Sequence, residues 1–381
     1  MIVDPEFIAR EFPQTEDIIY LNHAAVSPWP LRTAKSVQDF ADENLHTGAT
    51  YYPKWLEKES RLKGQLQRLI NAPSIEDIAL LKNTSEALSV VAEGIDWKPG
   101  DNIVSSNEEF PSNRIPWQAQ AEKGVEYRQI DITDIENAEK QLINACDDKT
   151  RLIAISSVQY GSGRRLDLEL IGDFCCDNNI LFCVDAIQSL GALPFDVQKI
   201  KADFVMADAH KWMLGPEGIA LFYCAETVRE SLKLHQFGWH MVERMGDYDA
   251  KEWYPAASAR RFECGSPNML GIYALSASLS LIEEVSIENI SRIIFNNTKH
   301  IIDYINYNDD LLFLITPEDE RHHAGIVTFK IIEKNNAEIH SNLMKNKVIC
   351  ANRQGGIRFS PHFYTSTDTI NKGLEVLYSI I

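Results

Sequence analysis

Lys211 occupies a position that suits an amine nucleophile. It follows an apolar run that ends at Asp208, has His210 as its neighbour, and precedes the turn that begins at Gly215. A lysine at the end of a buried strand loses hydration, which lowers its pKa and makes the amine a nucleophile or a base. A lysine chosen at random extends into solvent instead. The strand end before this lysine and the turn after it favour the chemical role.

A carboxylate stands at the end of another apolar run. Asp185 lies near the end of residues 180–186, and Gln188 follows it three positions later. A buried carboxylate is costly unless it meets a positive partner. It can cap the next helix, or it can pair with the protonated ring nitrogen of a cofactor. The pattern leaves both uses open.

Thr84 and Ser85 open a helix directly after a third apolar run. Asn83 and Glu86 predict a capping box there. The free N–H groups of the first turn, together with the two hydroxyls, can hold a phosphate, although a plain helix cap explains the same residues. No G-x-x-x-x-G-K-[ST] loop occurs, and residues 161–166 lack the third glycine of a dinucleotide fingerprint. Nucleotide binding therefore has weak support.

These residues need a scaffold that brings strand ends together. Short apolar runs alternate with helical patterns such as 84–95, which predicts a mostly parallel sheet covered by helices on both sides. Functional groups gather at the carboxyl ends of the strands in such a sheet. Phe110 follows one of these ends and can either stack on a flat ligand or join the core. The expected strands are residues 77–81, 102–106, 151–158, 180–186, 202–208 and 218–224.

The pattern changes in the last third of the chain. Helical stretches at 269–285 and 287–306 lead into further short strands, which predicts a smaller α+β domain. The first residues of the chain are expected to join it. We therefore expect a large domain over residues 21–264 and a small domain formed by residues 1–20 and 265–381.

The composition limits the partners and the compartment. The 381 residues carry 55 acidic and 37 basic side chains, a formal net charge of −18, which disfavours nucleic acid and anionic membranes but permits a small anion in a local pocket. No apolar run is long enough to span a bilayer, and the acidic start of the chain is unlike a signal peptide. The seven cysteines are scattered without metal-binding spacing, which predicts reduced thiols in a cytoplasmic protein and no metal site.

The order of the candidate groups is the order that a phosphorylated pyridine aldehyde requires. A helix for the phosphate comes first, followed by an aromatic residue, Asp-x-x-Gln and His-Lys. With the stretches "VDAIQ", "DAHKWMLGPEG" and "RFECGSPNMLGIYAL", the chain resembles the class V aminotransferase family of pyridoxal-phosphate enzymes, which includes cysteine desulfurases, isopenicillin N epimerase and kynureninase. The resemblance runs from residue 20 to residue 370. It implies the α/β architecture of fold type I, with a seven-stranded sheet in the large domain, and a homodimer with shared active sites.

The resemblance also implies a role for each matched residue. Lys211 is the catalytic lysine, which forms a Schiff base with pyridoxal 5'-phosphate and then acts as base at Cα of an amino-acid substrate. Arg358 matches the arginine for the substrate carboxylate, with His23 and Gln159 as further candidates on the substrate side. Ser266 matches a residue that reaches the phosphate of the neighbouring subunit. The candidates for cofactor binding are Thr84, Ser85, Phe110, Asp185, Gln188, Asp208, His210, Lys211 and Ser266.

Three departures from the desulfurase pattern leave the reaction open. Phe110 stands where desulfurases carry a histidine over the ring, and Asp208 stands where they often carry a serine. Cys350 lies so close to Arg358 that little room remains for the mobile loop that carries their cysteine. Transamination, epimerisation and lyase chemistry are all expected candidates, and a cysteine desulfurase or selenocysteine lyase using Cys350 is the alternative. An inactive binding scaffold is disfavoured by the complete catalytic set, and a nucleotide-dependent dehydrogenase is disfavoured by the incomplete glycine fingerprint.

Overall fold

A central sheet of seven strands forms the large lobe of the computed structural model, which describes residues 4–15 and 17–381. The strand order is β2-β8-β7-β6-β5-β3-β4. Neighbouring strands pair in parallel except at β8, which runs antiparallel to both β2 and β7. The carboxyl ends of the other strands therefore meet at one edge. The strands are β2 (Ile78–Leu81), β3 (Asn102–Ser106), β4 (Glu126–Ile130), β5 (Thr150–Ser156), β6 (Leu181–Asp185), β7 (Phe204–Asp208) and β8 (Ala220–Cys224).

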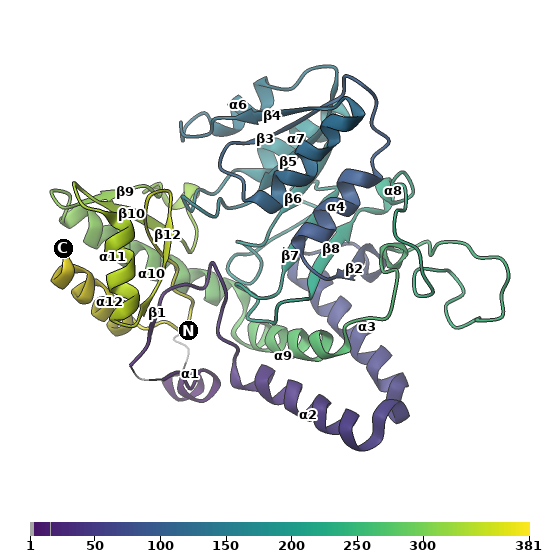
Figure 1. Ribbon diagram of the computed structural model, residues 1–381, viewed down its shortest axis with the longest axis horizontal. Helices are drawn as coiled ribbons and strands as arrows, with labels where there is room; N and C mark the ends of the chain where they lie inside the picture. Colours follow the sequence, from purple (N-terminus) through teal and green to yellow (C-terminus); the bar gives the residue numbers. More distant parts are fainter. Residues whose placement is uncertain (1–3, 16) are drawn as a thin grey trace.

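Helices cover both faces of this sheet (Figure 1). Successive strand residues such as Val205 and Met206 point to opposite faces and join separate cores. One core is closed by α4 and α5, and the other by α3, α7 and α9. The helices of this lobe are α2 (Leu31–Thr47), α3 (Tyr52–Leu69), α4 (Thr84–Gly94), α5 (Ile115–Ala119), α6 (Ala138–Asn144), α7 (Leu168–Asn178), α8 (Glu226–Arg229) and α9 (Met269–Val285).

The small lobe is built on an antiparallel sheet in the order β12-β13-β10-β9. It lies beside the large sheet, coloured green to yellow in Figure 1, and Thr328 Oγ1 ties it to the large lobe by donating a hydrogen bond of 2.6 Å to the carbonyl of Gly161. Strand β1 pairs in parallel with β11, so the start of the chain joins this lobe. Its elements are β1 (Ile19–Tyr20), α10 (Ile287–Tyr307), β9 (Leu312–Leu314), β10 (Val327–Ile331), α11 (Asn336–Lys345), β11 (Val348–Ile349), β12 (Ala351–Arg353), β13 (Gly356–Phe359) and α12 (Thr367–Ile380). Helix α1 (Pro5–Glu11) packs instead against the large lobe, where Glu11 pairs with Arg32 of α2.

The predicted strands and the three predicted helices agree with the observed elements, with two differences. Strand β4 is an additional edge strand whose residues are half-buried or exposed, so it forms no apolar run. Strand β8 is antiparallel because residues 209–219 connect it to β7 without the crossover helix that a parallel strand needs. The proposed domain boundary stays a prediction. Helix α9 packs against α2 and α3, as in the hydrogen bond of 2.7 Å between the Thr33 and Ser278 hydroxyls.

No single helix in the described ranges is long and apolar enough to cross a membrane. Helices α9 and α10 meet the length and composition criteria only when they are taken together, and the break between them bends the pair by 81°. Most side chains of α9 are buried within the protein.

Candidate active site

The loop between β7 and β8 carries Lys211 to the carboxyl edge of the sheet. The next residue, Trp212, is fully buried, and its Nε1 donates a hydrogen bond of 2.9 Å to Gln188 Oε1. Gly191 permits the close approach of the loop, because a Cβ atom at this position would lie 2.2 Å from the Trp212 carbonyl oxygen. The Gln188 amide also donates to the carbonyl of Ala24 at 3.0 Å, which leaves one of its N–H groups for a ligand. The loop is thus held rigidly behind Lys211.

The Lys211 amine is half-buried and carries no hydrogen bond or ion pair to another described residue. Its Nζ atom lies 5.8 Å from the ring centroid of Phe110. Burial lowers the pKa of Lys211; the negative charge of Asp185 opposes this shift, and the positive charge of Arg358 adds to it. An amine that is unpartnered and more readily deprotonated than usual is suited to attack a carbonyl group.

Asp185 lies at the carboxyl end of β6 and is only 2% exposed. The only hydrogen bond of its carboxylate within the described residues is the one of 3.0 Å that Oδ1 accepts from the backbone N–H of Ile187. Burial raises the pKa of Asp185, and the charge of Lys211 opposes that rise. A buried carboxylate with one hydrogen bond gains most from a cationic partner. The Asp185 carboxylate is therefore suited to pair with a protonated ring nitrogen of a cofactor.

The amino end of α4 and the end of β7 face one another. The backbone N–H of Thr84 donates to Asp208 Oδ2 at 3.0 Å, and the N–H of Asp208 donates to Thr84 Oγ1 at 3.0 Å. Ser85 Oγ donates to Ser112 Oγ at 2.7 Å. His210 Nδ1 lies 3.7 Å from Asp208 Oδ1 and has no hydrogen-bond partner. Hydroxyls, a helix terminus and an imidazole suit a phosphate, but the Asp208 carboxylate already takes one helix donor.

The predicted capping box at this helix forms only in part. Asn83 Oδ1 accepts from the N–H of Glu86 at 2.8 Å, as predicted. The Glu86 carboxylate accepts instead from the N–H of Lys82 at 2.7 Å, one residue before the expected donor. The cap still fixes where the helix begins, so Thr84 and Ser85 occupy its first turn.

Arg358 is positioned by β13 and is 1% exposed. Its Nη1 donates to the carbonyl of Tyr160 at 2.7 Å and its Nη2 to Asn22 Oδ1 at 3.4 Å, while Nε has no partner. Burial lowers its pKa to about 9. The ring of Tyr160 contacts Phe110 edge-on at 5.0 Å between centroids. A buried guanidinium without an acidic partner is suited to bind a carboxylate.

His23 and Gln159 are both fully buried, and their polar atoms serve internal contacts. His23 Nδ1 donates to the carbonyl of Ser360 at 2.8 Å, so its Nε2 accepts the Tyr364 hydroxyl at 2.6 Å. Gln159 Nε2 donates to Glu109 Oε1 at 2.7 Å, and only its Oε1 stays unpartnered. Their contact with a substrate stays a prediction.

Ser266 is exposed and does not join these groups within its own chain. It lines a hollow of about 200 Å³ with Lys82 and Glu86. This position is open to another molecule, so the predicted role in a neighbouring subunit stays a prediction.

Sequence reasoning missed Glu109, which stands beside Phe110. Its carboxylate accepts hydrogen bonds from Asn113 at 2.8 Å, from the N–H of Ser156 at 2.9 Å and from Gln159. Its charge adds to the rise in the pKa of Asp185. The signal was the pair of acidic residues, Glu108 and Glu109, that follows a buried strand after a single asparagine, where an unpaired carboxylate is costly.

Cys350 lies between β11 and β12, is 3% exposed and joins the core of the small lobe. Burial raises its pKa to about 12. The following hairpin closes through a two-residue turn, Gln354 and Gly355, with φ values of 53° and 70°. Cys350 is thus followed by a tight hairpin, and burial disfavours its thiolate form. Its predicted role as a sulfur carrier stays a prediction.

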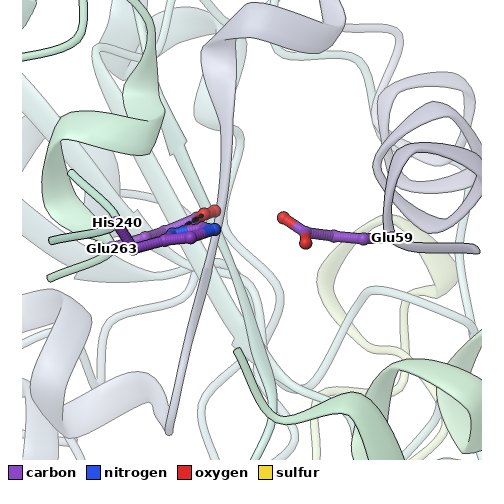
Figure 2. A group of neighbouring side chains, drawn as sticks. All are labelled: Glu59, His240 and Glu263. Carbon is purple, nitrogen blue, oxygen red and sulfur yellow. Dashed lines mark ion pairs between the residues drawn. The ribbon is translucent and has the colours of Figure 1, made fainter. Parts of the chain in front are cut away.

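A second polar cluster lies away from these residues. Figure 2 shows Glu59 on α3 facing His240 and Glu263. Lys63 Nζ lies 2.8 Å from Glu263 and 3.1 Å from Glu59, and His240 Nδ1 is 3.4 Å from Glu263. Burial disfavours the charge on Lys63, but the two carboxylates raise its pKa above the ordinary value. The ammonium group of Lys63 contacts both carboxylates, so the cluster ties α3 to the segment before Ser266.

The chain is similar to known proteins over nearly its whole length. The model of the family "Aminotransferase class-V" matches residues 19–370. A probable cysteine desulfurase of Methanothermobacter thermautotrophicus is 29% identical over 98% of each chain, and the uncharacterised aminotransferase YcbU of Bacillus subtilis is 27% identical over 97% of this chain and 96% of its own. An apo cysteine desulfurase from Thermococcus onnurineus superposes with a TM-score of 0.87 at 25% identity, covering 99% of this chain and 98% of that one.

A cystine C–S lyase bound to its product, cysteine persulfide, shares the fold, with a TM-score of 0.89 at 22% identity over 96% of this chain and 99% of that one. The predicted fold type I architecture is therefore confirmed. The cofactor prediction is confirmed as well, since the family depends on pyridoxal phosphate and the neighbours include a structure with glycine linked to that cofactor. The chain belongs to the class-V aminotransferase family, and it is a pyridoxal-phosphate-dependent enzyme that acts on an amino acid.

Proposed function

We propose that Lys211 is the residue that binds the cofactor aldehyde and that an amino acid replaces it there. The observation that carries this proposal is that the half-buried Lys211 amine, which has no hydrogen bond or ion pair to another described residue, lies within electrostatic range of the buried Asp185 carboxylate and of Arg358, which has no acidic partner there. Pyridoxal phosphate, when bound, supplies an aldehyde that links to amines and a ring that withdraws electrons from Cα. The residues around the cofactor must stabilise the charges of the ring nitrogen and of the substrate carboxylate, and one of them must accept the proton from Cα.

Each residue then has one task. Asp185 keeps the ring nitrogen protonated, because a neighbouring positive charge stabilises its buried carboxylate. Arg358 binds the substrate carboxylate through guanidinium N–H groups that have no partner within the protein, Nε among them. Once Lys211 is released, its Nζ accepts the proton from Cα, a task for which the lowered pKa of this amine is suited. Phe110 lies over the amine and shields it, but a phenyl ring moves no proton.

We further propose that the reaction does not pass through a persulfide on the enzyme. Several relatives are named probable cysteine desulfurases, which makes cysteine the first substrate to test. A buried Cys350 with a raised pKa is unsuited to accept sulfur. Lyase or transamination chemistry, in which the side-chain group leaves directly or stays in place, is therefore favoured over a Cys350-dependent desulfurase.

The test is a spectral titration of the purified holoenzyme with a panel of amino acids, including cysteine and alanine, in parallel with Arg358→Lys. We expect one amino acid to shift the cofactor absorption of the wild type at micromolar to millimolar concentration. Arg358→Lys should keep the unliganded spectrum but bind that amino acid about ten- to a hundredfold more weakly, because a lysine cannot make the two-pronged contact. A holoenzyme whose spectrum responds to no amino acid would overturn the proposal.

We also propose a cytoplasmic homodimer. The seven cysteines are free, and Ser266 is exposed. The segment before it, residues 236–258, extends away from the body of the protein in Figure 1 and exposes Phe237, Trp253 and Tyr254. Exposed aromatic side chains on a projecting segment are typical of an interface. Light scattering should give twice the mass of the chain, and Phe237→Ser with Trp253→Ser should reduce it; a monomeric wild type would contradict the proposal.

A further inference from the structure

Two arginines lie on the same face of one β-hairpin beside the candidate site. Strands β12 and β13 pair antiparallel, with Ala351 opposite Arg358 and Arg353 opposite Gly356. Residues two apart on a strand point to the same side, and directly opposed residues do so as well. Arg353 is therefore the diagonal neighbour of Arg358, a relation in which long side chains reach one another.

Contacts with the large lobe fix the hairpin in place, so the orientation of the face that carries the two arginines is fixed as well. Gln354 and Gly355 form its two-residue turn with positive φ values. The Gln354 side chain packs on Gly161, where an added Cβ atom would lie 2.9 Å from Gln354 Cγ. The preceding residue, Tyr160, accepts the hydrogen bond of Arg358. The turn and the Arg358 guanidinium thus both contact residues 160–161 of the large lobe.

No acidic side chain neutralises either arginine within the described residues. Arg353 forms no ion pair there, and its hydrogen bond is to the carbonyl of Asn352 at 2.7 Å. Arg358 also has no acidic partner and keeps Nε free. Both guanidinium charges lower the pKa of Lys211, so both lie within electrostatic range of the reacting amine. In a chain of net charge −18, two uncompensated cations beside one amine form a local anion site.

We propose that Arg353 is a specificity residue that binds a second anionic group, so that the preferred substrate is an amino acid with an acidic side chain. This rests on the proposed function, in which Arg358 holds the α-carboxylate. The α-amino group points to the cofactor, and the side chain of the substrate extends along the hairpin face toward Arg353. A neutral side chain would leave the Arg353 guanidinium unpaired, whereas an anionic one gains a charge-assisted hydrogen bond.

The test compares the affinity of the holoenzyme for matched amino acids by spectral titration. The pairs are aspartate with asparagine and glutamate with glutamine, which differ in charge at nearly equal size. We expect the wild type to bind the acidic member of at least one pair more tightly. Arg353→Gln should weaken that acidic member about ten- to a hundredfold and change the neutral member less than about threefold, since one charge-assisted contact is lost. Arg353→Lys should recover part of the difference.

Arg151→Gln is the matched control, because Arg151 is an exposed arginine near the start of β5, at the opposite end of that strand from the site. It should leave both affinities unchanged. A wild type that prefers the neutral members, or an Arg353→Gln variant that weakens both members equally, would overturn this inference alone. A holoenzyme that responds to no amino acid would overturn the proposed function with it.

Discussion

Replacing Cys350 by alanine distinguishes the proposed reaction from a desulfurase that carries sulfur on the enzyme. Cys350 is 3% exposed and lies among the apolar side chains of the small lobe. Burial raises the pKa of its thiol to about 12, and the positive charge of Arg358 offsets only part of that rise. If the thiol does no chemistry, its removal should leave the reaction unchanged.

The raised pKa determines the expected reactivity. At pH 8 a thiol of pKa 12 is ionised in about one molecule in ten thousand, whereas a free cysteine of pKa near 8.5 is ionised in about one in four. The more basic thiolate is intrinsically more nucleophilic, which recovers about 25- to 55-fold over this pKa difference. The Cys350 thiol should therefore still react about 40- to 100-fold more slowly than a free cysteine, and the poor access to the buried sulfur slows it further. Cys350 should therefore react far more slowly than an exposed cysteine.

The assay combines alkylation with product formation. Native protein is treated with iodoacetamide at pH 8, and the labelled peptides are quantified by mass spectrometry. The exposed Cys176 should be modified within minutes, and Cys350 should stay unmodified until the protein is unfolded. Cys350→Ala should retain sulfide release from cysteine, if cysteine is a substrate, within about twofold of the wild type, a factor that corresponds to about 0.4 kcal/mol. Cys176→Ala serves as the control variant.

Two results would refute this reasoning. One is labelling of Cys350 in the native protein at the rate of Cys176. The other is a loss of sulfide release of more than tenfold in Cys350→Ala while the cofactor absorption band is intact. Either would reinstate Cys350 as a sulfur carrier.

Two further predictions follow from charges around the site. Asp208→Asn should lower the dissociation constant for pyridoxal phosphate, measured by fluorescence titration of the apoprotein. Asparagine still accepts the N–H of Thr84 but removes a negative charge next to the residues that would hold the phosphate; weaker binding would contradict this. His362 is fully buried, and burial lowers its pKa to about 4. The neutral form is favoured in the folded state, so the free energy of unfolding should fall as the pH drops from 6.5 toward 4. The stability advantage of the wild type over His362→Gln in urea unfolding should shrink by about 2 kcal/mol between pH 7.5 and pH 5, and an unchanged difference would contradict this.

The scaffold of the site was predictable because its strands are apolar on both faces. Asp185 and Asp208 interrupt such runs at their ends, and a charged residue after a buried strand is informative in a parallel sheet. Strand β4 was missed because it lies at the edge of the sheet and its side chains are not fully buried. The direction of β8 depends on the connection from β7, which is a tertiary property that local patterns do not encode.

The substrate side of the site was harder to predict. Arg353 and Arg358 belong together only through the register of a hairpin, and the turn that sets this register needs positive φ at Gln354, a residue with no turn signature of its own. His23 and Gln159 match motif positions, but their hydrogen-bond partners lie hundreds or tens of residues away. A single sequence carries no record of such partners.

The most direct test of the account is to locate the amine that holds the cofactor. The holoenzyme is reduced with borohydride, which fixes the pyridoxyl group to the amine that it is bound to, and the modified peptide is sequenced by mass spectrometry. The account predicts the pyridoxyl group on Lys211 Nζ, and it predicts that Lys211→Ala lacks the visible absorption band of a cofactor bound to a lysine. A pyridoxyl group on another lysine, or an unmodified Lys211 in protein saturated with pyridoxal phosphate, would contradict it.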